Sequence, residues 1–166
     1  SLPNIKQTDV DYSTALRKLI NETDWSFTHK RIQLPKGLRL VMGDVKSGSE
    51  TTKMVAKVKQ WYQENYPRSH EIYNSINEGN MKFIEALDTL NKTNDGALVS
   101  EIDSGNVTSR VLVDARDAIE QVRENFRIIT NEGNVDVEPV VQTQLLDQGL
   151  NEKGVLTAMI PGAGGY

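Results

Sequence analysis

The longest regular pattern in this sequence is a series of apolar residues in the second half of the chain. Its members recur at alternating steps of three and four positions: Leu112, Ala115, Ile119, Val122, Phe126 and Ile129. An α-helix repeats every 3.6 residues, so this spacing places the apolar side chains on one face of a helix. Because a long helix with one apolar face must be covered by other elements, this segment restricts the possible folds more than any other.

Four other segments show helical spacing of their apolar residues. They are residues 9–21, 47–65, 69–91 and the short stretch that opens with Glu138 and Pro139. Ser47 and Glu50 have the spacing of a capping box at the start of the second segment. Pro139 suits the first turn of the last segment, because a helix does not need the N–H group there.

Two details of these helices are open to a structural test. In the last helix, we expect Val141, Leu145 and Leu146 to point inward. In the long helix, Gly79 interrupts the apolar spacing and marks a candidate bend. Residues 92–109 follow this helix, show no period and are rich in Asn, Asp, Ser and Gly, so they predict a mobile surface loop.

Strand patterns occupy two other parts of the chain. Residues 25–34 are rich in aromatic and β-branched side chains, residues 38–42 place apolar residues at every second position, and the turn sequence of residues 34–37 lies between them. These features predict a β-hairpin, and the apolar run at 155–160 predicts a further strand. The chain is therefore expected to form a single α+β domain over residues 1–166, with a small antiparallel sheet packed on one side by several helices.

Composition and charge argue against several classes of function. The chain has a formal net charge of −4 and no cysteine. An acidic chain is a poor nucleic-acid surface, and a chain without cysteine has no disulfide or thiolate metal site. No run approaches the ~18 apolar residues of a membrane span. We expect no metal-ligand residues, no nucleic-acid partner, no membrane span and a cytoplasmic location.

A glycine-rich stretch follows the expected strand at 155–160. It consists of Gly162, Ala163, Gly164 and Gly165. A strand that leads into such a loop can present backbone N–H groups to phosphate oxygens, because glycine allows a close approach of the backbone. The alternatives are a tight turn between two strands and a flexible tail.

A second candidate phosphate site lies where the hairpin leads into the helix at 47–65. A helix N-terminus carries unpaired N–H groups and a partial positive charge, which favour anions. Lys46, Ser47 and Ser49 are the candidate ligands of such an anion. Ser47 could equally be a simple helix cap, and Lys46 a solvated lysine.

Three blocks of sequence, in this order, resemble the eukaryotic phosphomevalonate kinase family of the GHMP kinase superfamily. They are residues 42–51, the pair Gln142–Thr143 and residues 160–166, with Asp24–Trp25 upstream. The resemblance implies that 5-phosphomevalonate is phosphorylated to 5-diphosphomevalonate in isoprenoid and sterol synthesis, with ATP and Mg²⁺. It also implies the ferredoxin-like C-terminal domain of that superfamily. This chain would be the C-terminal portion, inactive alone, with the missing N-terminal half supplying the ATP loop.

The resemblance also implies roles for the candidate residues. The loop Gly162–Gly165 would support substrate or nucleotide phosphates, although Pro161 and Tyr166 depart from the pattern of bacterial relatives. Lys46, Ser47 and Ser49 would hold the phosphate of phosphomevalonate. Asp24 would orient or deprotonate the attacking phosphate, and its alternative is a turn residue after the first helix.

Two arginines are left out of the predicted site. Arg123 and Arg127 lie one helical turn apart, with Glu120 and Glu124 as neighbours, which is typical of a solvated helix face.

Other functions remain open from the sequence. A mevalonate or homoserine kinase of the same superfamily is one, and a non-catalytic helical interaction module with a glycine linker is another. The module predicts exposed apolar stripes on the 69–91 or 111–129 helices.

Overall fold

The computed structural model describes residues 8, 10–25, 31–43, 51–93 and 96–161. It divides into two compact units, residues 1–31 and residues 32–166, which are described separately. The first unit contains α1 (Tyr12–Glu22), which confirms the helix expected over 9–21. After this helix, the indole Nε1 of Trp25 donates a hydrogen bond to the carbonyl oxygen of Ile20 at 2.9 Å.

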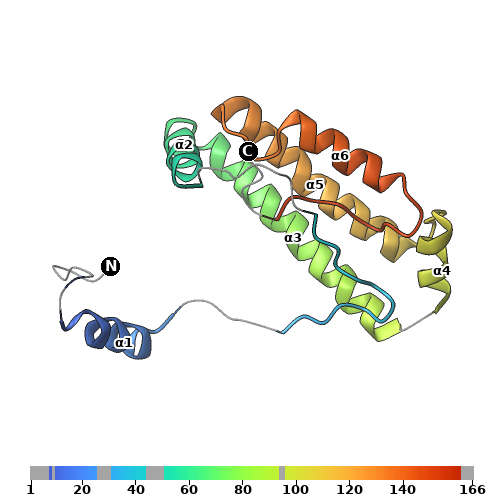
Figure 1. Ribbon diagram of the computed structural model, residues 1–166, viewed down its shortest axis with the longest axis horizontal. Helices are drawn as coiled ribbons and strands as arrows, with labels where there is room; N and C mark the ends of the chain where they lie inside the picture. The colour runs from blue at the N-terminus through green and yellow to red at the C-terminus, as the bar shows by residue number, and fades with distance from the viewer. Residues whose placement is uncertain (1–7, 9, 26–30, 44–50, 94–95, 162–166) are drawn as a thin grey trace. The chain divides into compact units, whose positions relative to one another are not determined.

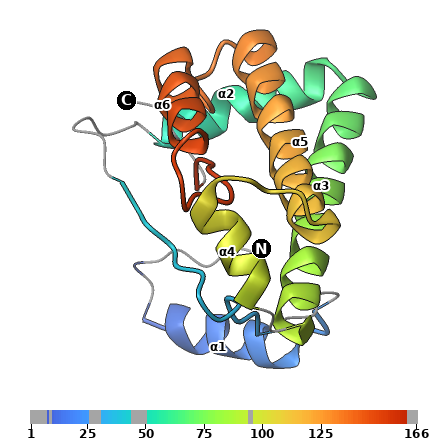
Figure 2. The same cartoon turned by 90° about the vertical axis from the view of Figure 1, so that its right-hand side faces the viewer.

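The second unit is built around two long helices, α3 (Arg68–Thr93) and α5 (Arg110–Gly133). They lie side by side in both views of the molecule (Figures 1 and 2). They run antiparallel, because the end of α3 and the start of α5 share one core cluster through Leu90 and Leu112. The other ends meet in a second cluster through Ile72 and Ile129.

Three shorter helices complete the described part of this unit. They are α2 (Thr51–Glu64), α4 (Gly96–Ser104) and α6 (Val140–Leu150). Figure 1 shows α2 near one end of the α3–α5 pair and α4 near the other. Trp61 of α2 is buried in the cluster with Ile72, and Ile102 of α4 is buried in the cluster with Leu90. The two short helices therefore close the two ends of the core.

The predicted apolar face of α5 is confirmed. Five of its six predicted members are buried: Leu112, Ala115, Ile119, Val122 and Ile129. Helix α3 continues unbroken through Gly79, which lies against α5. A Cβ atom at Gly79 would be 2.7 Å from Cγ2 of Val122 and 2.8 Å from the carbonyl oxygen of Ala118. Gly79 therefore allows close packing of α3 against α5.

The predicted α+β fold is wrong for the described residues, which form helices joined by irregular segments and include no strand. In 38–42 the predicted alternation does not produce an inward face, because Leu40, Val41 and Met42 are all exposed. Among the described residues of the expected hairpin, only a turn is formed, one residue later than expected, where the N–H of Leu38 donates to the carbonyl oxygen of Pro35 at 3.0 Å. The segment 155–160 is extended, but two of its carbonyl groups are bonded by an arginine of α5.

Two further expectations need correction. The predicted loop over 92–109 contains α4, because Leu98 and Ile102 are four residues apart and pack in the core despite the polar composition around them. In α6, Val141 and Leu145 are exposed, whereas the polar Gln142 is buried. Helix α6 therefore presents a polar face to the rest of the unit, because side chains of α5 bond to polar groups on that face.

Candidate functional site

The predicted phosphate ligands lie outside the described residues. These are Lys46, Ser47 and Ser49, and the loop of Gly162, Ala163, Gly164 and Gly165. The chain is described again from Thr51, where α2 begins, and up to Pro161, just after the buried Ile160. Asp24 is described, and it is exposed just after the end of α1. The assigned roles of all these residues stay predictions.

The described residues contain a different polar feature, on helix α5. Arg116, Glu120, Arg123 and Arg127 recur at steps of four, three and four, so they follow one face of the helix. We call these four residues the α5 polar stripe. Each of them bonds to other stripe residues, to the segment that contains α6, or to the segment 155–160.

The centre of the stripe is a buried ion pair. Arg123 has 0% side-chain exposure, and its Nη2 lies 2.8 Å from Oε1 of Glu138, whose side chain is also fully buried. The same Nη2 lies 2.8 Å from Oδ1 of Asp147 in α6, and Nη1 lies 3.4 Å from Oε2 of Glu120. The expectation that Arg123 belongs to a solvated face is therefore wrong.

Glu138 is held from several sides just before α6 begins. Its N–H donates to Oγ1 of Thr130 at 2.8 Å. Its carboxylate accepts hydrogen bonds from Oγ1 of Thr143 at 3.2 Å and from Nη1 of Arg127 at 3.3 Å. Arg127 also bonds Oε1 of Glu120 at 2.5 Å, which closes the network along α5. The start of α6 is thus fixed to α5 through Glu138 and Thr143.

The two central arginines are permanent cations in this environment. Burial alone would lower the pKa of Arg123, but the hydrogen bonds that it donates to Glu138 and Asp147 outweigh burial, and the pKa is raised. Burial likewise opposes the charge of Arg127, and the hydrogen bond and charge of Glu120 raise its pKa. An arginine is charged at physiological pH in any case. Arg123 and Arg127 therefore provide fixed positive charges.

The stripe also holds the segment that precedes the glycine-rich loop. Nε of Arg116 donates to the carbonyl oxygen of Leu156 at 3.1 Å, and Nη2 donates to the carbonyl oxygen of Val155 at 3.0 Å. Leu156 and Ile160 are buried, at 8% and 6% exposure. The segment is therefore attached to α5 at its start, by the bonds from Arg116 and by the packing of Leu156 in the cluster with Leu112.

A hollow of about 280 Å³ lies beside the stripe. It is lined by the stripe residues Arg116, Glu120 and Arg123, and also by Asp117, Ile119, Leu150, Asn151, Thr157 and Ala158. Acidic and basic groups both face it. Its volume is at the small end of ligand pockets, which span about 300–1,000 Å³.

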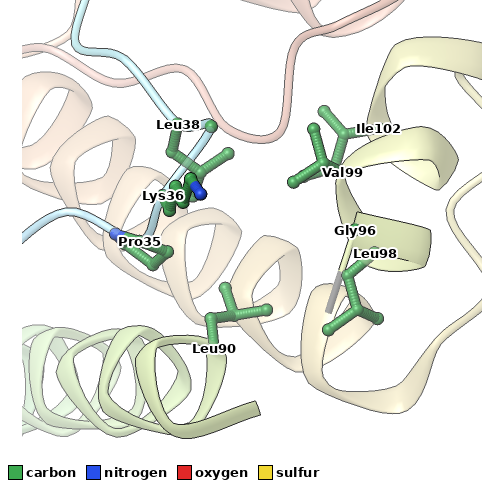
Figure 3. Close-up of a pocket in the computed structure, with 9 residues that line it drawn as sticks. Pro35, Lys36, Leu38, Leu90, Gly96, Leu98, Val99 and Ile102 are labelled. Carbon is green, nitrogen blue, oxygen red and sulfur yellow. The ribbon is translucent and has the colours of Figure 1, made fainter. Parts of the chain in front are cut away.

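A second hollow, of about 340 Å³, lies between the turn at 35–38, the end of α3 and helix α4. Figure 3 shows Leu38, Leu90 and Val99 around it. Among its described lining residues, Lys36 alone carries a charge. This apolar hollow lacks the several donors that a phosphate group requires.

A metal-binding cluster and a membrane-spanning helix are both absent from the described residues. Within that part of the chain, no group of three or more His, Asp or Glu side chains is arranged to hold a metal ion. None of the described helices has both the length and the apolar character needed to cross a bilayer.

Sequence reasoning missed Arg116 and Glu138 as parts of a site and misjudged Arg123. The local signal is the four-three-four spacing of charged residues on α5, which solvated helices also show. The partner that buries Arg123 is 15 residues away in sequence, so no spacing within the helix reveals it. The hydroxyl of Thr143, which belongs to one of the blocks that carry the resemblance, is bonded to Glu138.

Comparison with known proteins gives one consistent result. The chain is 37% identical over 158 residues to phosphomevalonate kinase of Candida albicans, an alignment that covers 93% of this chain and 35% of that protein. It is 30% identical over 158 residues to phosphomevalonate kinase of Gibberella zeae, covering 93% of this chain and 31% of that protein. The peroxisomal phosphomevalonate kinase of Arabidopsis thaliana is 29% identical, over 86% of this chain and 32% of that protein.

The chain thus spans about a third of the length of the curated relatives it matches, and it is homologous to them over most of its own length. No protein-family model matches the chain. No solved structure matches it either.

Proposed function

We propose that this chain, a homologue of phosphomevalonate kinases, is the substrate-side portion of such an enzyme. The enzyme would transfer the γ-phosphoryl group of ATP to the phosphate of 5-phosphomevalonate and release ADP and 5-diphosphomevalonate. The observation that carries the proposal is the 37% identity to the Candida albicans enzyme over 93% of this chain. Because the chain spans about a third of that enzyme, we expect it to be inactive alone and to act with the remaining part.

The chemistry of phosphoryl transfer explains what such a portion has to supply. The protein aligns two highly charged partners and neutralises the charge on their oxygens, and it needs little covalent chemistry. We assign the backbone of the loop Gly162–Gly165 to substrate or nucleotide phosphates. We assign Lys46, Ser47 and Ser49 to the phosphate of phosphomevalonate, because they precede the N-terminus of α2. Asp24 is the proposed group that orients or deprotonates the attacking phosphate.

The described residues do not fit a Mg²⁺ site. Mg²⁺ prefers free carboxylate oxygens and water in an octahedral arrangement. The carboxylates of Glu120, Glu138 and Asp147 are already bonded to Arg123. We therefore propose MgATP as the co-substrate of the complete enzyme and assign none of its metal ligands to this part of the chain.

The rival functions can be separated from the proposed one. The interaction module requires exposed apolar stripes on α3 or α5, but the apolar faces of these helices are buried in the two core clusters. A mevalonate or homoserine kinase would share the phosphate-binding features and differ in substrate. A coupled assay of ADP release, with phosphomevalonate, mevalonate and homoserine compared at equal concentration, therefore tests the proposal. The proposal would be contradicted if the complete protein that contains this chain phosphorylated mevalonate or homoserine but not phosphomevalonate.

The site assignment is tested by two substitutions in the complete protein. Gly164→Val should abolish most activity, because a branched side chain blocks the close backbone approach. Lys46→Met should raise KM for phosphomevalonate, whereas Lys59→Met, an exposed lysine of α2, should not. Unchanged kcat and KM in folded Lys46→Met protein would remove Lys46 from the site.

We also propose a cytoplasmic location. The absence of cysteine is compatible with the reducing cytoplasm, although the Arabidopsis thaliana relative is named peroxisomal. Microscopy of the complete protein with an internal fluorescent tag distinguishes the two compartments.

A further inference from the structure

We infer that one face of α6 is the surface on which the remaining part of the enzyme docks; this inference rests on the proposed function. Figure 1 shows α6 beside α5, at the edge of the helical unit. Steps of four residues place three exposed side chains of α6 in one row and two more in the row beside it. We call these five residues the α6 outer face: Val140, Gln144 and Gln148, with Val141 and Leu145.

The direction of the α6 outer face is fixed by the opposite side of the helix. There the hydroxyl of Thr143 donates to Glu138 at 3.2 Å, and Asp147 accepts a bond from the buried Arg123 at 2.8 Å. Gln142 is buried on the same inner side. Turning α6 to bury its apolar residues would break these bonds and leave buried charges without partners, which is costly. The outer face therefore points away from α5 as a fixed feature of the fold.

The α6 outer face contains no charged group. Asp147 is the only charged residue of α6, and its carboxylate is bonded to Arg123. Each of the other described helices exposes at least one charged residue: Lys18, Lys57, Glu78, Asp103 and Arg110, in chain order. A helix face in contact with water normally carries such groups, whereas the centres of protein interfaces are depleted of them. The outer face thus has the composition of an interface.

Three large apolar residues are exposed together on this face. Val140, Val141 and Leu145 are 71%, 61% and 58% exposed, and they lie within six residues. On the other described helices such residues stand singly or far apart, as do Tyr73 and Met81 of α3, eight residues from each other. A single exposed apolar residue needs no explanation, but a group of them beside polar residues marks an interaction site.

The comparison with relatives indicates what covers this face. The alignment includes 93% of this chain but only 35% of the Candida albicans enzyme, so about two thirds of that relative has no counterpart in this chain. Under the proposed function, the two parts form one active site, which requires a permanent contact between them. Permanent contacts are more apolar than transient ones, and the uncharged outer face suits such a contact. We therefore assign the face to the remaining part of the same polypeptide.

A cysteine on the outer face tests whether this face is covered. The chain has no cysteine of its own, so Leu145→Cys adds one thiol to this part of the complete protein. Its alkylation by N-ethylmaleimide is measured by mass spectrometry of the peptide that contains it. The reaction should be at least about tenfold slower in the folded protein than in urea-unfolded protein, because the covering part excludes the reagent. The control is Glu78→Cys, at an exposed position of α3, which should react within about threefold of its unfolded rate.

A photo-crosslinker identifies the covering segment. The complete protein is prepared with p-benzoylphenylalanine in place of Leu145, as a mixture of unlabelled and isotope-labelled copies. Crosslinked peptides are then mapped by mass spectrometry. We expect crosslinks within one copy, from position 145 to the part of the polypeptide that lies outside the region homologous to this chain.

Slow alkylation of Leu145→Cys, together with these crosslinks, supports the inference. Alkylation within about threefold of the unfolded rate overturns it, because the face is then open to solvent. The inference is also overturned if crosslinks are absent, or if they join two copies, two positions of this chain or another protein. Should Leu145→Cys fail to fold, Val141→Cys decides by the same criteria.

The proposed function is judged separately, by the assay of ADP release. If the complete protein does not phosphorylate phosphomevalonate but the crosslinks join its two parts, the proposed function fails and the docking face stands. If the protein is active and the face is open to solvent, the proposed function stands and the docking face is rejected.

Discussion

Nη2 of Arg123 lies 2.8 Å from Oε1 of Glu138, and both side chains have 0% exposure to solvent. Removing two charges from water costs several kcal/mol for each ion, so such a pair persists only where further hydrogen bonds satisfy both groups. Asp147 supplies such a bond to the arginine, and Arg127 and Thr143 supply them to the carboxylate. The pair therefore specifies how α6 is placed against α5.

Loss of one partner of this pair should be costly. Arg123→Met would leave Glu138 buried without its main cation, and breaking such a pair costs about 3–5 kcal/mol. We expect a value near the lower limit, because Arg127 and Thr143 remain bonded to Glu138. Urea-induced unfolding followed by circular dichroism gives the loss in free energy of unfolding.

The double variant Arg123→Met/Glu138→Met is the control for this prediction. Two apolar residues of similar volume leave no unpaired buried charge, so the double variant should be more stable than Arg123→Met alone. If the two single losses simply add in the double variant, the residues do not act as a pair.

The carboxylate of Glu101 should make the stability of the protein depend on acid pH. It accepts N–H hydrogen bonds from Thr108 and Ser109, both at 2.8 Å, and one from the Ser109 hydroxyl. The Ser109 hydroxyl is the largest cause that lowers the pKa of Glu101 from 4.5 to about 2. Because the folded-state pKa is lowered, this stabilisation is fully present above about pH 4.5 and is lost as the pH falls toward 2.

The substitution Glu101→Gln tests this dependence. It should lower the free energy of unfolding at pH 7 and make it less sensitive to pH between about 4.5 and 2, because the titrating group is gone. Urea unfolding at several pH values measures both effects. Glu124→Gln, at an exposed position of α5, is the control. Its free energy of unfolding should change with pH as that of the unmodified protein does. If the free energy of unfolding of Glu101→Gln changed with pH as steeply as that of the unmodified protein, other carboxylates would be the cause of the pH dependence.

Parts of this structure were predictable because their signal is local. The apolar spacing on α5 predicted five of its buried residues correctly, since a repeat of 3.6 residues is visible in one segment. The burial of Arg123 was not predictable, because a stripe of alternating charges looks the same on a solvated helix. Its partners Glu138 and Asp147 lie beyond the end of α5.

The errors in the predicted sheet and in α6 have a similar cause. A strand needs a hydrogen-bonding neighbour that is remote in sequence, and alternation within 38–42 contains no information on such a neighbour. In α6, Val141 and Leu145 were expected to face inward by their apolar character. The hydrogen bond that Thr143 donates to Glu138 and the one that Asp147 accepts from Arg123 instead turn a polar face toward α5. The residues of the proposed phosphate sites lie outside the described part, so their roles stay predictions.

Two glycines in helices offer a matched test of the packing between α3 and α5. Replacing glycine by alanine within a helix normally stabilises it by up to about 1 kcal/mol, because glycine loses more backbone entropy on folding. At Gly149 of α6 a new Cβ atom would meet nothing within 4 Å. Gly149→Ala should therefore stabilise the protein by an amount up to this value.

At Gly79 the same substitution should have the opposite sign. The new Cβ atom would lie 2.7 Å from Cγ2 of Val122 and 2.8 Å from the carbonyl oxygen of Ala118, which belongs to the backbone of α5 and cannot turn away. Val122 is itself fully buried, so the two long helices must separate. Overpacking of this kind costs about 1–3 kcal/mol, which exceeds the gain in helix propensity. Thermal and urea unfolding of both variants measure the difference, and a Gly79→Ala protein as stable as Gly149→Ala would mean that α3 and α5 do not pack as closely as described.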